Sequence, residues 1–189
     1  YRFVYVLPFS SHRVLVEDTT FSDGPALDVA ERTNAVRAYA ARMGWRVARV
    51  VRAEKGVLAM PWAAPEGPSA GEALAIGWRG GWFHPATGYS TPVALRVAAA
   101  LATVDPRHLA EDARTALHVL EGTLARQMWF ARLLNRLLFR AIAPSARRDI
   151  FERFHTMPEE SVLRFYGLRS TRADQLRVFC RRPPKGLHI

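Results

Sequence analysis

The sequence contains the stretch Arg13-Val14-Leu15-Val16-Glu17-Asp18-Thr19-Thr20-Phe21, whose β-branched and apolar residues predict a strand. Because side chains alternate along a strand, Glu17 and Asp18 are expected to point to opposite faces, each beside apolar neighbours. A carboxyl group held against apolar surface keeps its proton more readily, since its ionised form is poorly solvated there. Both acids are therefore candidates for a general acid. The alternative is that they mark the exposed end of a strand before the turn at residues 22–25.

The flanking residues predict a β-hairpin followed by one helix. Residues 1–9 alternate in the same way, and a short loop then leads into the acid-bearing strand, as in a hairpin. Residues 28–44 carry apolar side chains at helical spacing and end at Gly44, a residue that commonly stops helices. Two more strands are expected at residues 45–53 and 57–62. This first part of the chain thus predicts a sheet crossed by one helix.

A glycine-rich turn follows a proline- and glycine-rich loop at residues 61–71. The turn reads Gly80-Gly81-Trp82-Phe83-His84-Pro85-Ala86-Thr87-Gly88-Tyr89-Ser90, between a short strand expected at residues 73–77 and a helix expected at residues 93–104. A strand, a glycine turn and a helix can bring backbone N–H groups to an anionic or polar edge of a cofactor. A tightly packed turn uses glycines equally well, so the sequence leaves both interpretations open.

The histidines and the single cysteine favour no metal site. None of the six histidines pairs with a carboxylate at the spacing of metal ligands, and Cys180 is the only cysteine, which excludes an internal disulfide. Each lone histidine is expected to be structural. The exception is His84, whose place inside the glycine turn makes it a candidate site residue.

Helices are predicted for the rest of the chain, over residues 106–121, 123–143, 145–154, 158–165 and 172–179. The second of these is apolar on most sides and carries a strip of arginines, namely Arg126, Arg132, Arg136 and Arg140. One interpretation is a helix at a membrane interface, where guanidinium groups reach lipid phosphates. The other is a buried helix whose arginine side chains extend out of the core.

The composition is that of a basic globular chain. Of 189 residues, 49% are apolar and 23% charged, and the net charge is +10, carried almost wholly by arginine. Such a charge attracts anions, either nucleic acid or an anionic membrane surface. The arginines are spread over many elements without a helix-turn-helix, zinc-finger or RNA-binding signature, so we expect no nucleic-acid partner. The chain begins at Tyr1 inside a strand-like run, and we expect that an N-terminal part is missing.

Three stretches, taken together, resemble bacterial flavin-dependent lycopene beta-cyclases. They are residues 1–8 with 14–19, Gly80–Ser90, and residues 154–158 with 164–166. The resemblance implies an α+β chain that forms the sheet-plus-helix, substrate-covering part of a p-hydroxybenzoate-hydroxylase-like FAD fold, followed by a helical C-terminal region. Three parts are implied: a substrate-domain sheet with one helix at residues 1–72, a flavin-contacting strand-turn-helix at residues 73–104, and a helical region at residues 105–189 that is a candidate for membrane association.

The resemblance also implies an isomerase of the intramolecular lyase type. Each acyclic ψ-end of lycopene, or of a related acyclic carotenoid, is protonated, the tertiary carbocation closes on the neighbouring double bond, and proton loss gives a β-ionone ring. Reduced FAD is needed without net electron transfer, with NAD(P)H as the expected reductant. Because the substrate dissolves in bilayers, the enzyme is expected in the cytoplasm, peripheral to the inner face of the cell membrane.

Site residues follow from the same resemblance. Glu17 matches the acidic position of the family motif and is the expected general acid, and Asp18 is a weaker candidate that orients Glu17 or shares its role. The flavin is expected to be lined by Gly80, Gly81, His84, Pro85, Thr87, Gly88 and Tyr89. The polyene is expected to contact Trp62, Trp82 and Phe83, whose aromatic rings also stabilise positive charge.

Two departures from the family pattern limit these expectations. The Gly-x-Gly-x-x-Gly dinucleotide fingerprint is absent, so this chain needs an N-terminal FAD-binding portion of the same protein to hold FAD. Trp78 replaces the aspartate that many related flavoproteins place after the strand glycine. The alternative function is an FAD-dependent monooxygenase or oxidoreductase of the same fold, which would act on an apolar substrate and consume NAD(P)H in proportion to product.

Overall fold

The computed structural model describes residues 1–64 and 73–179, and the chain divides into two compact units, Tyr1–Leu58 and Ala59–Ile189. The described residues form one two-stranded sheet, in the first unit, and α-helices in both units. The chain is therefore α+β, as the sequence predicts.

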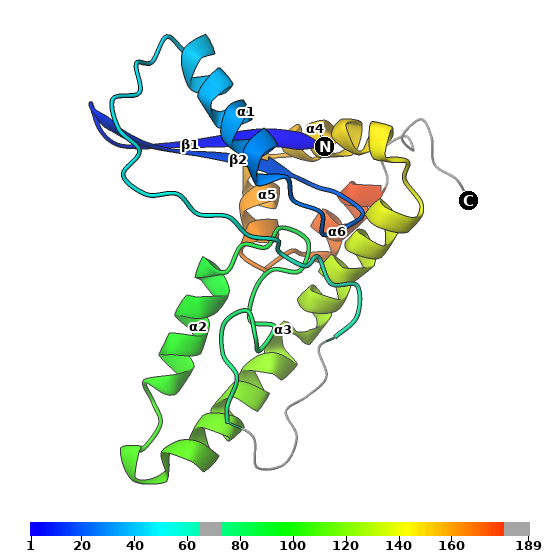
Figure 1. Ribbon diagram of the computed structural model, residues 1–189. Helices are drawn as coiled ribbons and strands as arrows, with labels where there is room; N and C mark the ends of the chain where they lie inside the picture. The colour runs from blue at the N-terminus through cyan, green and yellow to red at the C-terminus, as the bar shows by residue number, and fades with distance from the viewer. Residues whose placement is uncertain (65–72, 180–189) are drawn as a thin grey trace. The chain divides into compact units, whose positions relative to one another are not determined.

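The first unit is built on the predicted hairpin. Strands β1 (Arg2–Ser10) and β2 (Arg13–Thr20) pair antiparallel, with Tyr5 opposite Glu17 and Val4 opposite Asp18 (Figure 1). Helix α1 (Val29–Arg42) follows, and it begins where the sequence predicts, because the Asp28 side chain accepts a hydrogen bond from the Glu31 backbone N–H at 2.9 Å. Both the hairpin and the helix are confirmed.

The prediction of a larger sheet is wrong for the residues that the structure describes. Residues 45–53, 57–62 and 73–77 form no strand. Alternating apolar residues favour a strand only where a neighbouring strand pairs with its backbone N–H and C=O groups, and none of the described segments does so here. Val50 and Leu58 accordingly remain exposed. Most of the loop expected at residues 61–71, and Cys180, lie outside the described residues.

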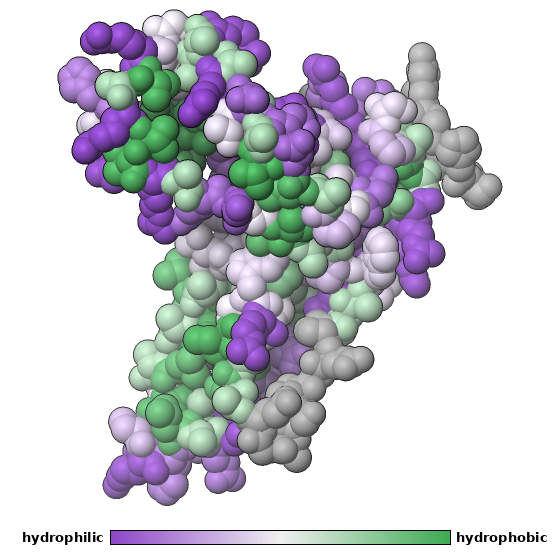
Figure 2. All heavy atoms as spheres, in the orientation of Figure 1, coloured by the Kyte–Doolittle hydropathy of each residue, from purple (hydrophilic) through white to green (hydrophobic). Residues whose placement is uncertain are grey.

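The second unit is helical, and its core lies between two long helices. Helix α2 (Thr91–Leu101) packs beside α3 (Leu109–Arg140), which a short 3-10 turn, η1 (Pro106–His108), precedes (Figure 1). The buried core cluster consists of Val93, Val97, Leu117, Leu124, Met128 and Leu168. Hydrophobic side chains also gather on the surface over α2 (Figure 2).

Helix α3 corrects the prediction of two separate helices that meet near Gly122. The structure has one helix of 32 residues, and Gly122 lies within it. A glycine inside a helix costs only about 1 kcal/mol relative to alanine. Leu117 and Leu124 are buried on either side of Gly122, and burying a leucine contributes roughly 2 kcal/mol. Packing therefore outweighs the glycine.

The remaining predicted helices are confirmed. After the 3-10 turn η2 (Pro144–Ala146) come α4 (Arg147–His155), α5 (Glu159–Tyr166) and α6 (Arg172–Phe179). Met157 and Phe165 are buried, so the segment around α5 contributes to the core of this unit.

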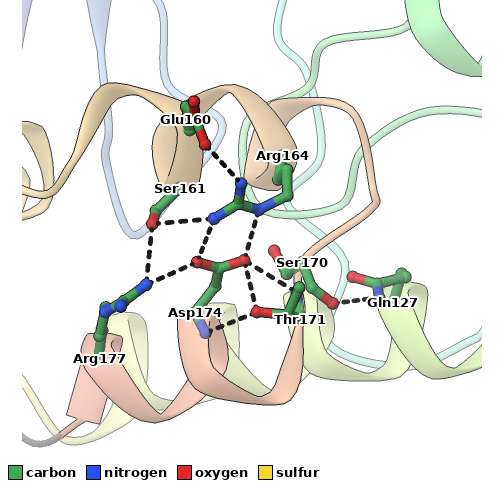
Figure 3. Close-up of polar contacts among 8 residues, drawn as sticks. All are labelled: Gln127, Glu160, Ser161, Arg164, Ser170, Thr171, Asp174 and Arg177. Carbon is green, nitrogen blue, oxygen red and sulfur yellow. Dashed lines mark hydrogen bonds and ion pairs between the residues drawn. The ribbon is translucent and has the colours of Figure 1, made fainter.

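A buried aspartate joins α5 to α6 (Figure 3). The Asp174 carboxylate, on α6, accepts two 2.8 Å hydrogen bonds from the Arg164 guanidinium and one from the Thr171 backbone N–H at 2.9 Å. Thr171 accepts in return from the Asp174 backbone N–H at 3.1 Å, which makes a reciprocal cap at the start of α6. Hydrogen bonds from Arg164 hold the pKa of Asp174 far below its usual range.

The Asp174 network predicts a large stability difference between two neighbouring acid variants. Asp174→Asn should lower the free energy of unfolding at pH 7 by roughly 2–3 kcal/mol, because Arg164 loses its buried partner. Glu160→Gln, which removes an exposed partner of the same arginine, should change it by less than about 0.5 kcal/mol. Urea unfolding checks both.

The difference in unfolding free energy between wild type and Asp174→Asn is expected to depend on pH. Because the folded-state pKa of Asp174 is lowered, wild type should lose its advantage over Asp174→Asn as the pH falls below about 4, where the unfolded carboxylate takes up a proton. Equal unfolding free energies at pH 7 would show that the network does not stabilise the chain.

Candidate functional site

A cleft of about 370 Å³ lies in the second unit, and aromatic side chains form much of its wall. It is lined by Ala59, Pro61, Trp62, Ala63, Ala64, Trp78, Gly81, Phe83, Pro85 and Arg132. The rings of Trp78 and Phe83 stack with their centroids 3.8 Å apart and their planes 18° apart. Sites for small ligands commonly have volumes of roughly 300–1,000 Å³, so the cleft has room for a flat ring system.

The glycine turn supplies one edge of this cleft. Gly81 and Gly88 have φ angles of +71° and +72°, which side-chain-bearing residues rarely adopt. A Cβ at Gly80 would overlap the Ala75 carbonyl oxygen and lie 2.6 Å from the Trp82 ring. These glycines are therefore required by a tight turn, and the same turn carries Gly81 and Pro85 into the wall of the cleft.

His84 holds this turn against α5. The side chain is 1% exposed, its Nε2 lies 3.0 Å from the Phe165 carbonyl oxygen, and its Nδ1 accepts from the Ala86 backbone N–H at 3.2 Å. These partners assign the ring proton to Nε2. Burial lowers the pKa of His84 to about 4, so the imidazole is neutral. Both ring nitrogens are engaged, and the His84 backbone N–H donates to the Tyr89 carbonyl at 2.9 Å. His84 is not part of the cleft lining, and its flavin contact stays a prediction.

Asn135 of α3 joins the two rims of the cleft, and sequence reasoning missed it. Its Nδ2 donates to the Pro61 carbonyl at 2.9 Å and to the Pro85 carbonyl at 2.7 Å. Both N–H groups of a buried amide are thereby satisfied. The available signal was a polar residue on the apolar face of a helix, which predicts buried hydrogen-bond partners.

The two predicted acids lie on β2, in the first unit, and face opposite ways. Asp18, with its side chain 3% exposed, is bound by Arg2 at 2.7 and 2.9 Å and by Arg32 of α1 at 3.2 Å. Burial raises the pKa of Asp18, but the hydrogen bonds from both arginines outweigh it and leave the pKa below its usual value. The expectation that apolar surface keeps Asp18 protonated is therefore wrong, and Asp18 is suited to a structural role.

Glu17 is exposed and lies on the other face of the hairpin. The Thr19 hydroxyl donates to a Glu17 carboxylate oxygen at 2.7 Å, and Tyr5 is its cross-strand neighbour. On the same face, the rings of Phe3 and Tyr5 meet edge to face with centroids 5.0 Å apart, and that of Phe21 lies 5.9 Å from Phe3. Tyr5 is 49% exposed, so this face presents a carboxyl group on an open aromatic surface.

Some of the residues predicted to contact the flavin or the polyene line the cleft. Gly81 and Pro85 line it together with Trp62 and Phe83. An adjoining pocket of about 110 Å³ is lined by Gly80 and Trp82, among others, and Arg132 borders both spaces. Thr87, Gly88 and Tyr89 lie on the turn but are not part of either lining, and the Tyr89 ring instead contacts Tyr166 with centroids 6.2 Å apart.

Burial of His84 predicts a specific loss of stability in mild acid. The unfolded imidazole binds a proton near pH 6.5 and the folded one only near pH 4, so wild type should lose about 2–3 kcal/mol of unfolding free energy between pH 7 and pH 4.5 on this account. The His84→Gln variant, whose amide can donate to the Phe165 carbonyl, should not show this loss of unfolding free energy between pH 7 and pH 4.5. Urea unfolding at the two pH values measures the difference.

The exposed His155 provides the control for that experiment, and His155→Gln should follow wild type at both pH values. An identical pH dependence in His84→Gln and wild type would contradict the structural role of a neutral His84.

Comparison with known proteins places the whole chain in one family. The family model described as lycopene cyclase protein matches residues 1–188. The chain is 41% identical over 188 residues to the lycopene beta-cyclase of a Paracoccus species and 36% identical over 194 residues to that of Pantoea ananas, each over 97% of this chain. It is 29% identical over 129 residues to the chloroplastic lycopene beta cyclase of Arabidopsis thaliana, over 67% of this chain and 25% of that protein.

The chain spans about half the length of the bacterial relatives, 48% in both cases. No solved structure matches it.

Proposed function

This chain belongs to the lycopene cyclase family, and we propose that it acts as part of a lycopene beta-cyclase, an isomerase of carotenoid biosynthesis. In this proposal the ψ-ends of lycopene, or of a related acyclic carotenoid, close to β-ionone rings. Its support is the similarity to bacterial proteins of that name along nearly the entire chain.

Glu17 is the proposed general acid. Its proton passes to the terminal double bond of the ψ-end, the tertiary carbocation is attacked by the neighbouring double bond, and a proton leaves a ring carbon. The proton gained and the proton lost balance, so substrate and product are isomers. When a polyene covers the aromatic face around Phe3 and Tyr5, the carboxyl group loses contact with water and its protonated form is favoured. Water, which would quench the cation, is displaced from that face.

The assignment of Glu17 as the general acid rests on the different partners of the Glu17 and Asp18 carboxylates. Asp18 is ionised by two arginines, whereas no lysine or arginine among residues 1–64 and 73–179 pairs with Glu17. A carboxylate bound by guanidinium groups is a poor proton donor, because its pKa is lowered. Glu17 is thus the member of the pair that can hold a proton when solvent is excluded.

The proposed cofactor is reduced FAD, within a p-hydroxybenzoate-hydroxylase-like fold whose dinucleotide-binding portion would precede this chain in the same protein. The cleft fits a flavin ring: Trp62 and the stacked Trp78 and Phe83 offer flat walls, and the buried Nε of Arg132 has no hydrogen-bond partner among the described residues. When bound, the reduced flavin would supply an electron-rich ring without net electron transfer. NAD(P)H is the proposed reductant.

The outer face of α3 is a proposed contact with an anionic membrane surface on the cytoplasmic side. Trp129 is 63% exposed, and Arg126 and Arg136, which share its face at three- and seven-residue spacing, are also exposed. Tryptophan and arginine are suited to the headgroup region. Another face carries the buried Leu124 and Met128, as the buried-helix interpretation predicts. None of the helices in the described part of the chain is long and apolar enough to cross a bilayer.

The acid assignment is tested in a chimera in which this chain replaces the matched segment of the Paracoccus relative. In lycopene-accumulating bacteria, wild type should convert lycopene to β-ring carotenoids. Glu17→Gln should lower ring formation at least about a hundredfold, the usual scale of a general acid, while the flavin absorbance of the purified protein stays unchanged. Chromatography of extracted pigments measures the product.

Asp18→Asn is the matched control for Glu17→Gln. It should reduce the stability of the chimera and still allow ring formation per folded molecule. Cyclisation by Glu17→Gln would contradict the acid assignment. Oxygenated products formed with stoichiometric loss of NAD(P)H would instead identify a monooxygenase.

The membrane proposal predicts that charge on α3 controls vesicle binding. Each arginine near an anionic surface contributes about 1 kcal/mol, so Arg126→Gln with Arg136→Gln should weaken binding to phosphatidylglycerol vesicles about thirtyfold. The pair Arg37→Gln with Arg49→Gln removes the same charge from other exposed positions and should have a much smaller effect. Equal losses in both double variants, measured by vesicle sedimentation, would mean that only net charge matters.

A further inference from the structure

Arg132 is a cation whose polar contacts are incomplete. It extends from α3 and borders both the cleft and the adjoining pocket. Its Nε is buried without a hydrogen-bond partner in the described part of the chain. A buried donor left without an acceptor costs roughly 1–3 kcal/mol, and more when it is charged. Such an atom is expected where a ligand supplies the acceptor.

Neighbouring groups compensate this charge only in part. Burial lowers the pKa of Arg132, and the negative charge of Glu121 in the adjoining pocket raises it. The guanidinium nevertheless stays protonated, as it does in proteins generally. No ion pair within 4 Å joins Arg132 to Glu121 or to another acid among residues 1–64 and 73–179. Asn135 lies one helical turn from Arg132, and its side-chain amide donates to the backbone carbonyls of Pro61 and Pro85.

The cleft around Arg132 favours a flat aromatic ligand. Trp78 and Phe83 present stacked rings, Trp62 adds a third, and Gly81 has no side chain to fill the space. Arg132 is the only charged residue among the described lining residues. The Arg140 guanidinium lies 5.0 Å from the centroid of the Trp62 ring, but Arg140 does not line the cleft. A neutral polyene would offer Nε no acceptor. A phosphate group is usually held by several donors rather than by one.

We propose that this cleft binds a flat aromatic ring in its anionic form, with Arg132 as the counter-charge. The identity of the ring rests on the proposed function. The reduced isoalloxazine ring of a flavin loses a proton near neutral pH and becomes an anion, whereas the oxidised ring is neutral. Arg132 therefore binds the reduced form more tightly, which is the form that a redox-neutral cyclisation uses. Residues near the ring tune flavin chemistry through such charges.

The test measures binding of riboflavin to the flavin-free form of the chimera with the Paracoccus relative, by anaerobic equilibrium dialysis at pH 8. Dithionite-reduced riboflavin should bind about tenfold more tightly than oxidised riboflavin, the size expected for one charge pair in a partly buried cleft. Arg132→Gln should remove this preference, because it should lower the affinity for reduced riboflavin more than the affinity for oxidised riboflavin. Arg37→Gln, at an exposed position on α1, should keep it.

Two further measurements keep the proposal testable if Arg132→Gln folds poorly. Arg132→Lys retains the charge and should retain most of the preference. For wild type, the preference should disappear at pH 5, where the reduced ring is neutral.

Equal affinity for the two forms, no binding of either form, or a preference that survives in Arg132→Gln would overturn the proposal. These outcomes are separate from the pigment assay of the chimera. A chimera that cyclises lycopene while its flavin-free form shows no preference for reduced riboflavin would remove the role of Arg132 and leave the proposed function standing. A chimera that does not cyclise would remove the proposed function.

Discussion

The ion pairs of Asp18 with Arg2 and Arg32 are the constraint on which the first unit depends. They join both strands to α1, and they fix which face of the hairpin the helix covers. Because strand side chains alternate, the neighbouring Glu17 is necessarily placed on the opposite face, with Phe3 and Tyr5. Two adjacent residues of the same chemical type thus have different partners: Asp18 binds two arginines, and Glu17 accepts from the Thr19 hydroxyl. Asp18 is the acid held by arginines, and Glu17 is the proposed proton donor.

In the second unit, buried polar side chains position the cleft. Asn135 holds Pro61 and Pro85, His84 holds the carbonyl of Phe165, and Gln127 donates to the Ser170 carbonyl at 2.8 Å. Each contact satisfies a polar group that would otherwise be costly to bury, so the network specifies one arrangement of turn and helices. Among the described residues, Arg132 Nε and Gln175 Nε2 depart from this rule, since both are buried without a hydrogen-bond partner. Arg132 is the one of these two residues that borders the cleft, and it therefore directs attention to a ligand.

Local sequence patterns predicted the hairpin and most helices, because spacing and caps act within a few residues. The pattern at residues 45–53 failed, since a strand needs a partner that its own sequence cannot supply. The division at Gly122 failed because packing on both sides outweighs the preference of one residue. At the candidate site, alternation separated Glu17 from Asp18 correctly, but the arginines that ionise Asp18 were not foreseeable. The partner of His84 lies 81 residues away and the two partners of Asn135 lie 74 and 50 residues away, beyond any local signal.

Protonation of an alkene by a carboxylic acid is the central claim, and isotope incorporation tests it most directly. Lycopene is incubated with the reduced chimera in deuterium oxide, and the cyclised product is examined by mass spectrometry. Transfer of a solvent-equilibrated proton from Glu17 predicts one deuterium for each ring formed, with NAD(P)H unconsumed beyond the initial reduction of the flavin. Cyclised product without deuterium, or product formed with one NAD(P)H oxidised per turnover, would contradict the account.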